Sequence, residues 1–229
     1  MRSCPPFLLL LIAASALTAC DVNGDVTATQ GAAANTINGS VHVPAGVHGG
    51  AVGTVNGGIR IDDNAVVTKA ETVNGAITVA AHASAGSVET VNGAVTLGDG
   101  ARVTHGVTTV NGAIQLESGA DVGGKLQNVN GQITLASAHV GGGLRTVDGD
   151  IDISGESRVE GGILVEPSNN ALFGAPSPHK PRIVIGAGAV VQGDLRFERD
   201  VLLYVNDKAT VGPITGATAI RYSGDKPAG

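Results

Sequence analysis

The chain has 229 residues, a formal net charge of −6, 35 glycines, no tryptophan and 42% hydrophobic residues. The negative charge argues against a nucleic-acid partner, because such a partner requires a basic protein face. Abundant glycine together with valine, isoleucine and alanine predicts an all-β chain of short strands and tight corners rather than helices.

Residues 1–19 are predicted to be a lipoprotein signal peptide. Arg2 precedes the apolar run Phe7–Ala14, which is too short to span a membrane. The run leads to Leu17-Thr18-Ala19-Cys20, which resembles the lipobox of bacterial lipoproteins. That resemblance implies cleavage before Cys20 and its acylation with fatty chains such as palmitate. We therefore expect a membrane-anchored cell-envelope lipoprotein, on the outer membrane or on the periplasmic face of the inner membrane.

Residues 20–34 are expected to form an N-terminal tether and residues 35–165 a repeat array. A Thr-Val-Asn-Gly-like tetrapeptide recurs every 18 or 19 residues, and aliphatic residues recur about every six positions within that period. Three six-residue segments in each repeat predict one triangular coil of about 18 residues. The predicted fold is a single-stranded parallel β-helix, or β-solenoid, of about nine coils and roughly 40 Å. The usual preference of parallel crossovers predicts a right-handed coil.

The six-residue spacing predicts one inward aliphatic residue on each face of a coil. On the first face these are the valines of the tetrapeptide, such as Val73 and Val91, and Val88 lies three residues ahead of Val91, so a bulge is expected there. The third face is expected to pack small residues inward, namely Ala65, Ala83, Ala101 and Ala120. The tetrapeptide threonines form a parallel column, and the mixed polar positions beside it argue against an ice-binding surface.

An asparagine precedes a glycine at the same corner of successive predicted coils, so the asparagines form a column. The structural interpretation is a hydrogen-bonded ladder at tight turns where Asn and Gly tolerate positive φ, and the alternative is a row of amides for a ligand such as a glycan. The sequence favours the ladder, which consists of Asn38, Asn56, Asn74, Asn92, Asn111 and Asn130.

The sequence contains no catalytic or metal-binding motif with the required spacing. The six histidines fall at different offsets in the repeat, so no metal site or cofactor is predicted. Glu71 and Glu89 are expected to stack, either around a cation or simply in water. Hexapeptide-repeat acyltransferases share the six-residue rhythm, but they need an activated acyl donor that an exported protein would not meet. The chain is therefore not expected to be an enzyme.

The last third departs from the repeat. Residues 166–182 are predicted to be a proline-rich loop, residues 183–223 the last coils with a cap at 200–222, and residues 224–229 a tail. The loop is a possible interaction site through Leu172, Phe173, His179 and Lys180, and packing against the cap is the alternative.

The pattern V-x-T-V-N-G-A-I-x-V, as in Val88–Leu97, resembles a bacterial adhesin-type β-solenoid domain family that is largely of unknown function. The resemblance covers residues 36–165 and implies architecture rather than activity. The coils are also similar to those of bactofilins, polymerising scaffold proteins of the cytoplasmic side, from which the lipobox departs.

These observations predict a non-catalytic cell-envelope lipoprotein that presents a rigid rod for adhesion or scaffolding. The alternative is a glycan-binding or glycan-cleaving β-helix protein. The expected partners are the membrane through the lipid anchor, a cell-envelope protein or polysaccharide, and a second copy of the chain.

Overall fold

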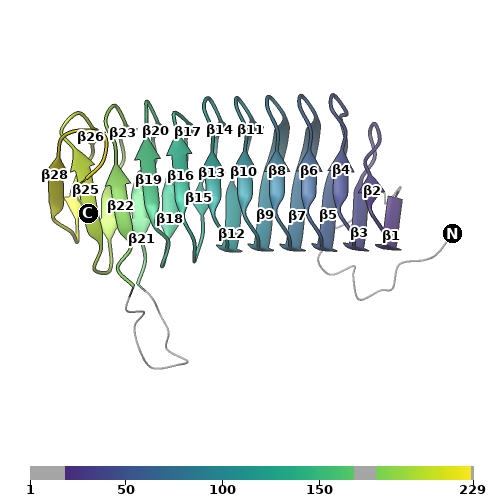
Figure 1. Cartoon of the computed structure of the whole chain (residues 1–229), viewed down its shortest axis with the longest axis horizontal. Helices are drawn as coiled ribbons and strands as arrows, with labels where there is room; N and C mark the ends of the chain where they lie inside the picture. Colours follow the sequence, from purple (N-terminus) through teal and green to yellow (C-terminus); the bar gives the residue numbers. More distant parts are fainter. Residues whose placement is uncertain (1–18, 168–178, 228–229) are drawn as a thin grey trace, which may run out of the picture.

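The structure, a computed structural model, describes residues 19–167 and 179–227 of the chain. Its strands stack into an elongated rod with the first strands at one end and the last at the other (Figure 1). Strands pair in parallel with the coil that precedes or follows, as in Thr72↔Thr90. The predicted all-β parallel solenoid with coils of about 18 residues is confirmed.

Most coils contribute one strand to each of three faces, which we call the first, second and third face. The first face contains β1 (Ala19–Asn23), β3 (Ala34–Asn38), β5 (Ala51–Asn56), β12 (Val107–Asn111), β15 (Leu126–Gln127), β18 (Leu144–Thr146), β21 (Ile163–Val165), β24 (Leu195–Phe197) and β27 (Ile214–Thr215).

The second face is an 11-stranded sheet. It contains β2 (Val26–Thr27), β4 (Val41–Val43), β6 (Ile59–Ile61), β8 (Ile77–Val79), β10 (Val95–Leu97), β13 (Ile114–Leu116), β16 (Ile133–Ala136), β19 (Ile151–Ser154), β22 (Arg182–Ile185), β25 (Leu202–Asn206) and β28 (Ala219–Tyr222).

The third face contains short strands. These are β11 (Arg102–Val103), β14 (Asp121–Val122), β17 (His139–Val140), β20 (Arg158–Val159), β23 (Val190–Val191) and β26 (Thr210–Val211). Two longer strands, β7 (Val66–Asn74) and β9 (Ser84–Asn92), run from the third face onto the first.

The core is a stack of inward aliphatic columns along the rod axis. On the second face each strand from β4 to β25 turns two aliphatic residues inward, such as Ile114 and Leu116, which are both fully buried. The third face packs alanine beside valine, as in Ala101 and Val103, because a narrow prism leaves little room between its walls. The four predicted alanines of this face are all buried, which confirms that expectation.

The first face differs from the prediction in which residue points inward. Val88 and Thr90 are buried and Val91 is 39% exposed, so the alternation that begins at Val88 places the threonine inside. The predicted inward valines and the predicted bulge before them are both wrong. The reason is that the period of two within a strand fixes the direction of each side chain once Val88 is buried.

Both ends of the rod also differ from the prediction. Residues 20–34, expected to be a tether, carry β1 and β2 and pair with the next coil, as in Cys20↔Asn35. The expected cap at 200–222 is instead formed by further coils, since β25 pairs with both β22 and β28. The 11 strands of the second face therefore give a rod of about 48 Å at the usual strand spacing, longer than expected.

Candidate functional site

The most regular surface feature is the corner where the first face meets the second. Here the coils of the N-terminal half present the tetrapeptide Thr-Val-Asn-Gly or a close variant of it, and each of its four residues has a different task. We call the outward column Ile37, Val55, Val73, Val91, Val110 and Val129, together with the asparagines that follow, the valine–asparagine ridge.

The threonine of the corner points inward and bonds to the coil before it. The hydroxyl of Thr54 donates to the carbonyl oxygen of Gly39 at 2.8 Å, and that of Thr72 donates to Gly57 at 2.9 Å. Thr36, Thr90 and Thr109 make the same bond. A buried hydroxyl is tolerated here because the carbonyl of the previous corner satisfies it.

The asparagines form a ladder with one direction. The side-chain amide of Asn56 donates to Asn38 Oδ1 at 2.9 Å, and each later asparagine donates to the one before it at 2.8–3.0 Å. Asn38 in turn donates to Asn23, which extends the ladder by one coil. Asn23 was missed because its coil is shorter, although Val22-Asn23-Gly24 carries part of the motif.

The glycine of the corner is required by close approach rather than by its φ angle. A Cβ on Gly75 would lie 1.9 Å from the carbonyl oxygen of Gly57, and Gly93 and Gly112 have the same contact with the glycine before them. Of the glycines that follow the ladder asparagines Asn38–Asn130, Gly131 alone has a positive φ, at 115°. The expectation that positive φ selects Asn and Gly at this corner is therefore wrong.

A shallow cleft of about 240 Å³ runs beside the ridge on the first face. It is lined by the outward valines from Val55 to Val110 and by Gly53, Glu71, Glu89 and Thr108, over β5, β7, β9 and β12. The cleft is mainly apolar because each coil contributes a half-exposed valine. Its repeat equals the strand spacing, so any partner meets the same groups once per coil.

The two stacked glutamates at the edge of this cleft are held by a lysine. Lys69 Nζ contacts Glu71 and lies 3.4 Å from Glu89. Burial lowers the pKa of Lys69, but the bonds and charges of the two carboxylates outweigh burial and raise that pKa above its ordinary value. The cation that this acidic pair was considered to hold is thus supplied by the chain itself.

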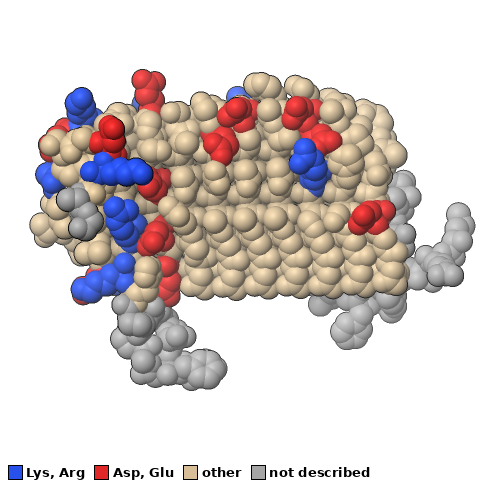
Figure 2. Space-filling view, in the orientation of Figure 1, with Lys and Arg blue, Asp and Glu red and all other residues tan. Residues whose placement is uncertain are grey.

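Charge is distributed unevenly over the rod. Figure 2 shows the charged side chains gathered toward the C-terminal end, while the lower rows of the N-terminal part carry none apart from the very end. This uncharged area lies along the corner that carries the asparagine ladder. Uncharged and partly apolar surface of this kind is typical of contact sites rather than of freely solvated faces.

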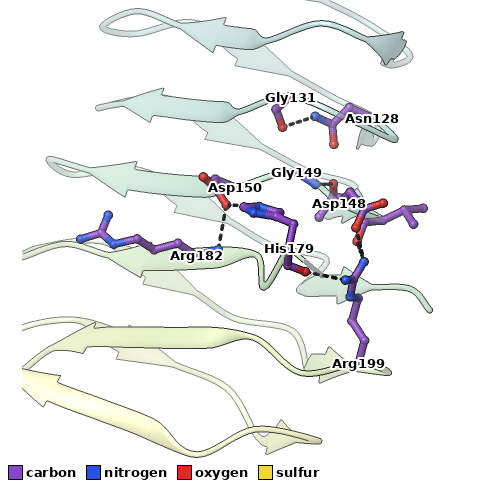
Figure 3. Close-up of polar contacts among 10 residues, drawn as sticks. Asn128, Gly131, Asp148, Gly149, Asp150, His179, Arg182 and Arg199 are labelled. Carbon is purple, nitrogen blue, oxygen red and sulfur yellow. Dashed lines mark hydrogen bonds and ion pairs between the residues drawn. The ribbon is translucent and has the colours of Figure 1, made fainter. Parts of the chain in front are cut away.

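The ridge ends at Asn130, one coil before a corner of different chemistry. Asp148 takes the ladder position, and Arg199, from two coils further on, contacts its carboxylate and donates to the carbonyl of Val147 at 3.0 Å (Figure 3). Arg199 also donates to the carbonyl of His179 at 2.6 Å. One guanidinium therefore ties three separate chain segments together. The role of Arg199 could not be read from the sequence because its partners are 20 to 52 residues away.

A second carboxylate, that of Asp150, holds residues 179–182, which lead into β22. Asp150 Oδ1 lies 3.1 Å from His179 Nε2 and accepts the backbone N–H of Arg182 at 2.8 Å (Figure 3). Lys180 lies 3.2 Å from Asp200. Of the predicted interaction loop, His179 and Lys180 thus contact the rod, whereas Leu172 and Phe173 lie outside the described residues.

Asn128 lies in the last coil of the ridge, directly before the corner that carries Asp148 in place of asparagine. It replaces a threonine, is 4% exposed, and donates its amide to the carbonyl of Gly131 at 2.8 Å in its own coil (Figure 3). Its Oδ1 is buried without a hydrogen-bond partner among the described residues. The threonine column therefore breaks one coil before the ladder does.

The histidines do not gather in one place, and three of them pair with different carboxylates. His42 Nε2 lies 2.6 Å from Asp62, and His139 Nδ1 lies 2.6 Å from Asp121. Within residues 19–167 and 179–227, no three or more His, Cys, Asp or Glu side chains come together in a way that could hold a metal ion. The same part of the chain contains no helix long and apolar enough to cross a membrane.

The lipid-attachment prediction concerns Cys20. The structure describes its backbone, which lies in β1 at the first coil, but not its side chain. Comparisons with known proteins give no relative, since no family model, no curated protein and no solved structure matches the chain. The resemblance to adhesin-type solenoids and to bactofilins therefore stays a prediction.

Proposed function

We propose that this chain is a non-catalytic lipoprotein of the bacterial cell envelope, anchored through Cys20, whose rigid solenoid presents the valine–asparagine ridge to a cell-envelope protein or polysaccharide. The observation that carries the proposal is the ridge itself. It repeats a partly exposed aliphatic side chain and a bonded amide in coil after coil, without charge, over the N-terminal half of the rod.

The position of Cys20 supports an anchor at one end of the rod. Its backbone pairs with Asn35, so an acyl group on Cys20 would be attached directly to the first coil, without an intervening tether. The last coil would then lie about 48 Å away along the axis. Such a geometry suits a protein that holds a contact surface at a fixed distance from a membrane.

The rigidity of the ridge supports a role in adhesion or scaffolding. Each ridge asparagine is held by its neighbours, and the valine beside it is fixed by the strand, so few side-chain rotamers remain to be lost on binding. A repeating partner, such as a polysaccharide or a protein sheet edge, could contact several coils at once. Avidity over many weak contacts then gives useful affinity.

Acyl labelling tests the anchor. Cells that produce the native chain, the Cys20→Ala variant or the matched Cys4→Ala variant are grown with a labelled fatty acid and fractionated. We expect label and membrane fractionation for the native chain and for Cys4→Ala, and loss of both for Cys20→Ala. Label that persists in Cys20→Ala would contradict the anchor.

Ridge variants test the contact surface. Val73→Lys, Val91→Lys and Val110→Lys are combined, and Thr78→Lys with Thr96→Lys serves as the control on the outward side of the second face. We expect the ridge variant to lose at least tenfold in co-sedimentation with isolated cell envelopes, whereas the control retains binding. Equal binding of both would show that the ridge is not the contact surface.

The second candidate function is a glycan-binding or glycan-cleaving β-helix. It is favoured by a separate cleft at the C-terminal end of the second face, where charged and aromatic side chains meet. Turnover of a cell-wall or capsular polysaccharide by the purified chain would contradict the non-catalytic proposal.

A further inference from the structure

A cleft of about 380 Å³ lies at the C-terminal end of the rod, between the second face and the last described residues of the chain. Its floor is Val184 in β22 and Gly186 just after that strand. The surrounding walls carry Thr134, Asp152, Ser154, Arg182, Tyr222, Asp225, Lys226 and Pro227. This volume falls within the range of small-molecule sites in proteins.

The outer wall of the cleft is held in place by specific contacts. The amide of Asn206 donates to the carbonyl of Gly224 at 2.8 Å, which fixes the segment that follows β28. The Tyr222 hydroxyl reaches back to the carbonyl of Ile185 at 3.4 Å, and Tyr222 is 9% exposed. The wall is therefore built by the fold.

Four charged side chains line the cleft, and their formal charges cancel: Arg182 and Lys226 are cationic, and Asp152 and Asp225 are anionic. No ion pair within 4.0 Å joins any of the four to another described residue, whereas other charges on the rod, such as Arg145 and Glu166 at 2.5 Å, do form pairs. The cleft thus offers donors and acceptors that are available to a ligand, without a net charge.

Aromatic rings complete the site. The Arg182 guanidinium lies over the Tyr204 ring, 5.1 Å from its centroid, so the arginine is positioned without being neutralised. Burial raises the pKa of the Tyr222 hydroxyl, the bond from Asn206 lowers it, and the charges of Asp152 and Arg182 act on it in opposite directions. The net effect is a pKa above the ordinary value of tyrosine, with burial as the main cause.

We propose that this cleft binds a neutral saccharide of a few units. A sugar hydroxyl both donates and accepts, and it is matched by guanidinium and ammonium donors set beside carboxylate acceptors. The cancelled charge does not favour an ionic ligand, and the aliphatic floor at Val184 suits the C–H face of a sugar ring. The inference goes beyond the proposed rod function and does not depend on the lipid anchor.

The two tyrosines of the chain make the test specific, since the chain has no tryptophan and both tyrosines lie at or beside the cleft. Protein labelled with 3-fluorotyrosine gives two ¹⁹F resonances. These are followed during titration with maltotriose and with triacetylchitotriose, two neutral trisaccharides. We expect a saturable shift of at least one resonance with at least one of the two sugars.

Variants assign the binding to the cleft. Arg182→Gln and Asp152→Asn are each expected to weaken the saccharide at least tenfold, whereas Arg60→Gln, on the same sheet near the other end, leaves it unchanged. An unchanged thermal transition confirms that each variant is folded, and a second substitution, Lys226→Gln, tests the wall without touching the sheet.

Two outcomes overturn the proposal. The first is the absence of any shift with either sugar. The second is tighter binding of an anionic trigalacturonate that is lost in both Arg182→Gln and Lys226→Gln, which would identify an anion site instead. Neither outcome bears on the ridge variants, so failure here leaves the rod proposal standing.

Discussion

The N-terminal coils, residues 35–130, and the C-terminal coils, residues 146–222, build the same prism with different corners. In the N-terminal coils Thr90 bonds to the previous corner and Asn92 joins a ladder. In the C-terminal coils Val165 and Phe197 occupy the threonine column as buried apolar residues. The inward columns therefore hold the fold in both regions. The residue types at the corner can change wherever the polar groups of the corner find other hydrogen-bond partners.

The two regions also differ on the surface. The N-terminal coils present an uncharged ridge with a valine in every repeat, and the C-terminal coils gather the charges, the rings and the polar cleft (Figure 2). A regular surface suits a repeating partner, whereas an irregular one can form a single site. The division of the rod matches the division between the two proposals above.

The largest expected loss of stability comes from placing a threonine, the residue of the N-terminal coils, in the same inward column of the C-terminal coils. Phe197→Thr removes a side chain that is 4% exposed and leaves a cavity, so we expect a loss of about 3 kcal/mol of unfolding free energy in urea denaturation. Phe197→Leu, the control, should lose about 1 kcal/mol. Equal losses would show that polarity and volume do not decide this position.

The next effect concerns the corner glycine. A Cβ on Gly75 would meet the Gly57 carbonyl at 1.9 Å, so Gly75→Ala should cost about 3 kcal/mol because backbone must move. At Gly49 the nearest atom to such a Cβ is 3.5 Å away, and Gly49→Ala should be neutral or slightly stabilising. Thermal unfolding of both variants makes the comparison, which fails if Gly75→Ala is tolerated.

Arg199 tests whether the C-terminal corner depends on its ion pair. Its side chain is 12% exposed and that of Asp148 is 20% exposed, so Arg199→Ala leaves a partly buried carboxylate without its partner. We expect a loss of about 2 kcal/mol, between the values for surface and buried pairs. Hydrogen exchange should rise first at residues 146–150 and 179–182, and a uniform rise along the rod would contradict a local role.

A smaller effect is expected for the threonine column. Thr90→Val keeps the shape of the side chain but removes the hydroxyl that donates to the Gly75 carbonyl at 3.0 Å. The expected cost is about 1 kcal/mol, measured by urea denaturation. Thr78→Val, on the outward side of the second face, is the matched control and should cost less. A Thr90→Val variant more stable than the native chain would show that the hydroxyl hydrogen bond does not stabilise the fold.

The smallest effect is a pH dependence on the third face. The bond to Asp121 raises the pKa of His139 above its ordinary value, and Glu160 adds to the rise. A raised folded-state pKa stabilises the fold fully below the unfolded pKa of about 6.5, and this contribution is lost as pH rises through the folded pKa. His139→Asn and Asp121→Asn should each reduce the change of unfolding free energy with pH over that range. An unchanged pH dependence in both variants would show that this pair does not contribute to stability.

Much of the fold was accessible from the sequence because its signals are periodic. The recurrence of Asn38, Asn56 and Asn74 and the aliphatic spacing of six predicted a parallel solenoid with the correct coil length. The asparagine ladder followed from the same recurrence. What failed was the direction of the tetrapeptide side chains, since a period of six assigns a column to a face but does not say which of two neighbours points inward.

The repeat, the fold class, the alanine-lined third face and the column of asparagines follow from the sequence alone, because each depends on residues that recur at a fixed interval. A second group of features depends on the tertiary structure: Thr90 is inside and Val91 outside, Cys20 pairs with Asn35 in the next coil, and Arg199 meets Asp148. The cleft beneath Tyr222 belongs to this second group as well. Such contacts join segments with no common period, and they form only when stacking brings distant coils to the same place.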